Sequence, residues 1–189
     1  MNDVLVRAKE LIGRPVVTVH GDRVAEVKDV VLGLRQAVLV GFTLRNPGFL
    51  GGPRNVSLPW GSVRALGPDA VMIDGPEALG SLAPAASETS EVHPTVAIPV
   101  MTDDGQRLGT VADVVLTTGA EPEVVGFEIT PEPGPSAHDH PVLVPYDVLV
   151  SASEQTVVVP ADAARFVHDD LAGFGAAVES FRQSHGGGR

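Results

Sequence analysis

The stretch Val27-Lys28-Asp29-Val30-Val31-Leu32 occurs a second time as Val111-Ala112-Asp113-Val114-Val115-Leu116. The residues that follow each copy recur in the same order, Val40-Gly41-Phe42 as Val125-Gly126-Phe127, then Leu58-Pro59-Trp60 as Val144-Pro145-Tyr146. A long-range repeat of this kind indicates duplication of a structural unit. The sequence therefore predicts two copies of one small domain within 189 residues.

Valine fills 31 positions of the chain, and β-branched residues favour pleated strands over helices. In the first copy, short apolar runs broken by turn residues predict strands at 16–20, 23–32, 37–45, 55–66 and 71–74. Pro59 must bend the fourth of these strands or lie at a sheet edge. Five strands in so short a segment predict a small barrel, so the predicted fold class is mainly all-β, with two tandem small β-barrels.

Two segments outside the barrels show helical spacing. Apolar residues recur along residues 3–12 until Gly13, which predicts a short N-terminal helix that plugs one end of the first barrel. A second series predicts a C-terminal amphipathic helix that begins near Asp162, with apolar residues Phe166, Val167, Leu171, Phe174, Val178 and Phe181. Gly173 and Gly175 weaken this helix by about 1 kcal/mol each. It therefore needs a packing surface, either on its own barrel or on a partner.

These patterns predict five segments. They are a first barrel domain with its helix at 1–75, a linker at 76–94, a second barrel domain at 95–160, the C-terminal helix at 161–183 and a tail at 184–189. The linker is rich in Pro, Ala, Ser, Gly and Glu and has no sustained apolar period.

Composition excludes several classes of function. The chain has no cysteine, which excludes disulfides, thiolate metal sites and cysteine nucleophiles. No secretory signal or long apolar run is present, so a cytoplasmic protein with no transmembrane segment is expected. The net charge of −11 argues against nucleic acid as a direct ligand. Residues 1–74 carry nine Lys/Arg and seven Asp/Glu, whereas residues 75–189 carry four and seventeen.

The repeated residues resemble a known family. The segments that carry the resemblance are Leu11-Ile12-Gly13-Arg14-Pro15-Val16, the turn Gly21-Asp22, Val27-x-Asp29-Val30, Val40-Gly41-Phe42 and Leu58-Pro59-Trp60. They look like the PRC-barrel domain, named for the H subunit of the photosynthetic reaction centre and also found at the C-terminus of a bacterial ribosome-maturation factor. The pattern covers about residues 11–75 and, more loosely, 96–160.

This resemblance implies a small all-β barrel that binds other proteins and has no shared catalytic centre. Unlike the reaction-centre subunit, the chain shows no transmembrane helix before the barrel, and it lacks the N-terminal domain of the ribosome factor. A tandem pair with no other domain is similar to stand-alone PRC-barrel proteins of bacteria.

The repeated carboxylates Asp29 and Asp113 are the first candidates for chemistry, because two carboxylates can share general acid and base work. Their equivalent places in the two copies favour a structural role inherited by duplication. Strand alternation predicts that Asp29 shares a face with Val27 and Val31 and accepts hydrogen bonds from a neighbouring loop.

The stretch His138-Asp139-His140, with Glu132 nearby, has side chains that bind metals. The histidines lie two residues apart in a loop of Pro, Gly, Ser and Ala, and the first copy has no matching histidine. The pattern favours a solvated loop, so no metal and no cofactor is expected, with His138 and His140 as the weak candidates.

Apolar and aromatic residues supply the candidates for partner binding. They are Phe49 and Leu50 in the Gly- and Pro-rich loop 46–54, Trp60 and Tyr146 after the repeated prolines, and Phe174 and Phe181 of the C-terminal helix. For Trp60 and Tyr146, packing inside the barrel is the alternative. The leading hypothesis is a non-enzymatic adaptor that binds a protein partner or copies of itself. One alternative is a small-molecule or metal-binding protein that uses the His138/His140 loop or a cleft between the barrels. The other is a ribosome-associated or RNA-processing factor.

Overall fold

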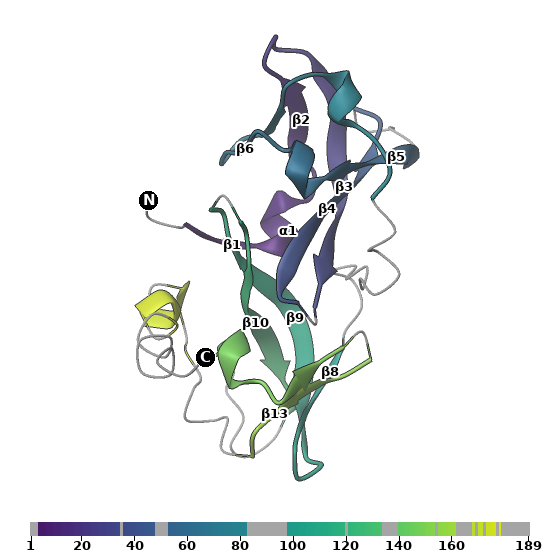
Figure 1. Cartoon of the computed structure of the whole chain (residues 1–189). Helices are drawn as coiled ribbons and strands as arrows, with labels where there is room; N and C mark the ends of the chain where they lie inside the picture. Colours follow the sequence, from purple (N-terminus) through teal and green to yellow (C-terminus); the bar gives the residue numbers. More distant parts are fainter. Residues whose placement is uncertain are drawn as a thin grey trace. The chain divides into compact units, whose positions relative to one another are not determined.

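The computed structural model describes residues 4–34, 36–47, 53–82, 98–119, 121–133, 140–153 and 155–161, with residues 168, 170, 171, 173–176 and 178. The chain divides into two compact units. The first unit is Ala8–Pro94, and the second unit combines Met1–Arg7 with Thr95–Arg189. Each unit is built around one sheet, as the ribbon in Figure 1 shows.

The sheet of the first unit has the strand order β5-β4-β3-β2-β7-β6. Its elements are α1 (Ala8–Leu11), β2 (Pro15–Thr18), β3 (Arg23–Gly33), β4 (Val38–Arg45), β5 (Pro53–Pro59), η1 (Trp60–Ser62), β6 (Ala65–Leu66), β7 (Val71–Ile73) and η2 (Pro76–Ala78). Neighbouring strands are antiparallel except β2 and β7, which pair in parallel. Because β2 near the start of the unit pairs with β7 near its end, the sheet curls on itself.

The second unit repeats this order as β11-β10-β9-β8-β13-β12. Its elements are β8 (Pro99–Thr102), β9 (Arg107–Thr117), β10 (Val124–Pro131), β11 (Val142–Pro145), η4 (Tyr146–Val148), β12 (Ser151–Ala152) and β13 (Val157–Val159). The parallel pair is now β8 with β13. The mainly all-β fold with two tandem copies is thus confirmed.

Both long strands, β3 and β9, carry a β-bulge at the same place in the repeat. Val27 pairs with Leu44 and Asp29 with Thr43, so Lys28 is an extra residue, and Ala112 is the extra residue of β9. A one-residue shift in register moves the following side chains to the other face of a strand. The predicted common face of Val27 and Asp29 is therefore wrong, because strict alternation stops at Lys28.

Both faces of these strands are buried. Val30, Val31 and Leu32 follow one another in β3 and are each at most 1% exposed. Phe42 and Phe127, at equivalent positions of the partner strands, are fully buried. A strand buried on both faces needs an apolar cover on the inside and on the outside of the sheet. This fold therefore requires apolar packing on the outer face of the sheet as well as in the core inside it.

On the outer face of each sheet, a glycine leaves space that a side chain from a later segment fills, and we call this position a glycine seat. In the first unit, a Cβ on Gly41 would lie 2.8 Å from Leu82 Cδ2 and would also meet the carbonyl oxygen of Leu58. In the second unit, a Cβ on the equivalent Gly126 would collide with the ring of Phe174. Each glycine thus leaves room for a side chain that enters from beyond the last strand.

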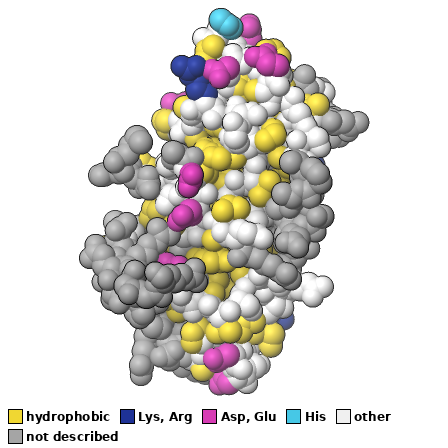
Figure 2. Space-filling view, in the orientation of Figure 1, with side chains coloured by type: hydrophobic (Ala, Val, Ile, Leu, Met, Phe, Trp, Pro, Cys, Tyr) yellow, Lys and Arg dark blue, Asp and Glu magenta, His cyan; other side chains and the backbone are white. Residues whose placement is uncertain are grey.

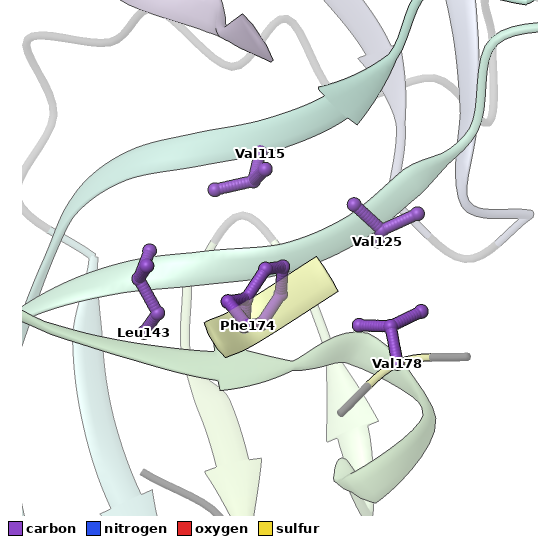
Figure 3. Packing of buried hydrophobic residues seen from close by; sticks show 5 residues of the cluster. All are labelled: Val115, Val125, Leu143, Phe174 and Val178. Carbon is purple, nitrogen blue, oxygen red and sulfur yellow. The ribbon is translucent and has the colours of Figure 1, made fainter. Parts of the chain in front are cut away.

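The seat in the second unit belongs to a buried cluster of Val115, Val125, Leu143, Phe174 and Val178. Figure 3 shows the Phe174 side chain on its helical segment, facing the strands that carry Val115, Val125 and Leu143. Leu5 and Leu171 are partly buried and pack against the same cluster. The C-terminal helical segment therefore packs within its own unit.

The N-terminal segment differs from the prediction. Residues 3–12 were expected to form one helix, but Leu5–Arg7 form strand β1 and only Ala8–Leu11 form α1. Strand β1 pairs with β9 of the second unit. Pairing with β9 outweighs the weak tendency of a ten-residue segment to form an isolated helix. Ala8 and Leu11 are buried, and α1 contacts β3 of the first unit.

The C-terminal helix begins later than predicted. His168 forms an isolated antiparallel bridge with Leu143, and the helical residues described are 171, 173–176 and 178. The predicted positions Phe166, Val167 and Phe181 lie outside the described residues. The first unit has an equivalent bridge between Ser57 and Gly80. Among the described residues, no helix has the length and apolar character needed to cross a membrane.

The glycine seats predict the cost of a single methyl group. Gly41→Ala should lower the free energy of unfolding of the first unit by about 1–3 kcal/mol, because the added carbon has no space and overpacking is costly. The fluorescence of Trp60, the single tryptophan, follows denaturation of this unit.

Gly80→Ala is the matched control, because no atom lies within 4 Å of the added carbon. Equal loss of stability in the two variants would contradict a steric role for Gly41.

Candidate functional site

The repeated carboxylates occupy different surroundings in the two units. Asp29 accepts a hydrogen bond from Thr43 Oγ1 at 3.1 Å, and Lys28 Nζ lies 3.2 Å from the same oxygen. Asp113 is 5% exposed and accepts a hydrogen bond from the backbone N–H of Val114 at 2.8 Å. The partners observed on both carboxylates belong to the local strand structure, and the two residues belong to different units.

The position opposite each repeated carboxylate distinguishes the copies. Thr43 faces Asp29 across the first sheet, whereas Glu128 faces Asp113 across the second. Two carboxylates side by side repel each other unless a cation compensates. Arg7 of β1 donates a hydrogen bond from Nε to Glu128 Oε2. Sequence reasoning missed this pair; the change from Thr43 to Glu128 beside a repeated aspartate was the available signal.

A second ion-paired group, also missed from the sequence, occurs in the first unit. Glu26 of β3 is 5% exposed and accepts a hydrogen bond from Arg45 Nε at 2.8 Å and another from Arg23 Nη2. Glu26 and Arg45 are direct cross-strand partners. Burial of a carboxylate is tolerated when charged donors satisfy it. The group therefore fixes the register of β3 and β4, and Thr110 replaces the carboxylate in the second copy.

Trp60 and Tyr146 each begin a short 3-10 helix after a proline of nearly identical conformation. Pro59 has φ −61° and ψ 143°, and Pro145 has φ −61° and ψ 141°. The ring of Tyr146 stacks on Phe127 with centroids 6.3 Å apart. Both Trp60 and Tyr146 are half-buried. Tyr146 thus packs on a core ring and keeps part of its own ring at the surface.

The remaining candidates are placed as follows. Phe174 is fully buried on the Gly126 seat, so its ring has no surface to offer to a partner and it leaves the set of candidate contacts. His140 is exposed. The other candidates, Phe49, Leu50, Phe181 and His138, lie outside the described residues. Among the described residues, no group of three or more His, Cys, Asp or Glu side chains could hold a metal ion.

The number of charged residues differs between the units. The first unit has eight Lys/Arg and nine Asp/Glu, and the second has five and fifteen. Figure 2 shows hydrophobic side chains interspersed with polar ones on the visible face, where acidic groups form small separate spots. Exposed large apolar side chains include Val4, Val19, Val38 and Val150. The acidic excess therefore belongs to the second copy.

Tyr146 gives a pH-dependent prediction. Burial, with a smaller contribution from Asp147, raises the pKa of the Tyr146 phenol above its usual value of 10.0. The folded state then binds the phenolic proton more tightly than the unfolded state, so stability of the second unit should fall as pH rises above about 10. Tyr146 is the only tyrosine, so ultraviolet absorbance of the phenolate follows its titration alone.

The midpoint should return toward 10 in denaturant, and Tyr146→Phe should remove both the signal and its share of the alkaline loss of stability. A native midpoint at or below the denatured one would contradict the packing described for this ring.

Comparison with known proteins addresses the origin of the two copies. The model of the PRC-barrel domain family matches residues 3–80 and again residues 91–166. A search of curated proteins found no significant match. The two matches agree with the repeated strand order and with the shared bulges, prolines and glycine seats. The chain therefore belongs to the PRC-barrel domain family and carries two copies of that domain.

Proposed function

We propose that the chain is a non-enzymatic interaction module whose two PRC-barrel domains bind another protein or a second copy of the chain. The observation that carries this proposal is that the repeated carboxylates, which were the first candidates for catalysis, make hydrogen bonds within their own sheets. Asp29 bonds to Thr43, and Asp113 bonds to the backbone of its own strand. Family membership agrees with such a role, since PRC-barrel domains are consistent with interaction modules.

The differences between the copies support two distinct contacts. The bulges, the prolines and the glycine seats are shared, and all of them shape the barrel. The segments that differ most connect β4 to β5 and β10 to β11. The first connection, 46–52, contains Phe49 and Leu50, whereas the second, 132–141, is polar and contains two histidines. Variation in connecting loops on a constant scaffold is how many domains acquire separate binding partners.

The apolar connection of the first unit gives the main test. The double variant Phe49→Asp with Leu50→Asp should lower recovery of the bound protein at least 10-fold, because two charges oppose burial of an apolar contact. Recovery is measured by affinity purification from the native host, and self-association by sedimentation of the purified chain.

Val19→Asp with Val150→Asp is the control, since it adds the same charges at exposed valines elsewhere. Unchanged recovery and unchanged self-association in the loop variant, with loss in the control, would sink the proposed role of this loop.

The metal-binding alternative rests on His138 and His140 and is tested separately. The nearby carboxylate Glu132 lies 2.9 Å from Arg107 Nε in an ion pair, which draws it away from a role as ligand. Elemental analysis of the purified chain should find zinc, nickel and manganese well below one atom per chain, with no change in His138→Ala/His140→Ala. Stoichiometric metal that disappears in this variant would replace the interaction proposal with a metal site.

A cytoplasmic location of the chain stays a prediction. Association with the ribosome or with RNA-processing proteins is a second prediction. The first unit is nearly neutral, so it is the part of the chain that could approach such a surface without strong repulsion. Identification of the co-purified proteins distinguishes this alternative from self-association.

A further inference from the structure

The chain passes between its two units at an unusual place. Residues Met1–Arg7 belong to the second unit, while Ala8, the next residue, begins the first. The peptide bond between Arg7 and Ala8 therefore joins the units with no linker residue when β1 is docked. The only other covalent connection is the segment that leads from the first unit into Thr95.

Strand β1 is docked by backbone and side-chain contacts. Leu5, Val6 and Arg7 pair with Thr117, Leu116 and Val115 of β9. The carbonyl oxygen of Val4 accepts hydrogen bonds from Thr118, at 3.1 Å from its backbone nitrogen and 3.2 Å from Oγ1. Val6 is 5% exposed, and Arg7 is hydrogen-bonded to Glu128 of β10. This short strand thus contacts both long strands of the second sheet.

The C-terminal helical segment secures this strand from outside. Leu5 packs against the cluster that contains Phe174 and Val178. A Cβ on Gly175 would lie 3.3 Å from Leu5 Cδ1, so the helix backbone approaches Leu5 closely at this point. Phe174 holds the segment in place because its ring fills the seat above Gly126. The side chain of Leu5 and the described residues of the C-terminal helical segment therefore pack together on one face of the second sheet.

We propose that β1 is a latch that ties the first unit to the second. We propose further that the C-terminal helical segment, of which residues 171, 173–176 and 178 are described, controls this latch. With the segment on the sheet, β1 stays docked and the units are joined by two covalent paths. When the segment leaves, Leu5 loses its apolar cover, β1 dissociates from β9, and the first unit is held only by the segment before Thr95.

The strand and the helix that form the latch each contribute little stability, so the latch can open and close reversibly. Strand β1 contributes three residue pairs. The three atoms nearest to a Cβ on Gly173 all belong to Asp170 and lie at ordinary distances of 3.5 Å and more, so no steric need explains this glycine. Glycine inside a helix weakens it relative to alanine. The helix is thus less stable than its packing would permit, which places it among the parts of a fold that open first.

Cleavage of the chain between the units gives a direct test. A site for a specific protease replaces residues 86–91, the purified full-length chain is cut, and gel filtration follows the two fragments at tens of micromolar. The fragments should co-elute, because β1 remains docked. Arg7→Glu places a like charge beside Glu128 and should raise the dissociation constant about 10-fold or more. Gly173→Ala should lower it about 2- to 5-fold by strengthening the helix.

Controls separate the latch from general effects. Lys9→Glu makes the same charge change two residues later, on α1, and should leave co-elution unchanged. Arg7→Glu combined with Glu128→Arg should restore it. Trp60 fluorescence and Tyr146 absorbance report that the first and second units remain folded in each variant. Separation of the unmodified fragments, or co-elution that persists after deletion of residues 1–7, would overturn the proposal.

Discussion

The long strands β3 and β9 bury both of their faces, and this constraint decides what the rest of each unit must supply. Val30, Val31 and Leu32 point to alternate sides of the first sheet, yet each is at most 1% exposed. One side is filled by the curled sheet itself, around Phe42 and Phe127. The other side needs a cover from outside the sheet, and the glycines of β4 and β10 are where that cover is accepted. Duplication preserved this requirement in both copies.

The copies meet the requirement in different ways. A single side chain, Leu82, lies against Gly41 soon after the bridge between Ser57 and Gly80. In the second unit the chain continues six residues beyond His168 before Phe174 reaches the equivalent seat. The outer face there carries Leu143 where the first unit has Ser57. The larger apolar face is matched by a larger apolar cover, which is why the C-terminal segment packs on its own unit.

The sequence predicted what local pattern and repetition determine. Alternating apolar runs located β2, β3, β4 and β7 within a few residues, and the repeat supplied their counterparts in the second unit. The single strand predicted at 55–66 is wrong, because this stretch is divided into β5, the 3-10 helix η1 and β6. Three features escaped because distant residues decide them. Strand β1 forms because β9 offers an edge more than a hundred residues away, the bulge at Lys28 breaks an alternation that looks regular in the sequence, and the bridge of His168 delays the helix. Among the candidate residues, the burial of Phe174 depends on Gly126 of β10, which is 48 residues away in the sequence.

Because β1 belongs to the second unit but precedes the first, the second copy of the repeat does not contain all the strands of its own sheet. A product that starts at Thr95 would contain every other strand of the second sheet and still leave Val115–Thr117 without the neighbour it has in the full chain. An unpaired strand edge next to apolar side chains is a template for aggregation. Separation of the two copies would therefore take β1 away from the second sheet and leave this part of β9 open to pairing with another chain.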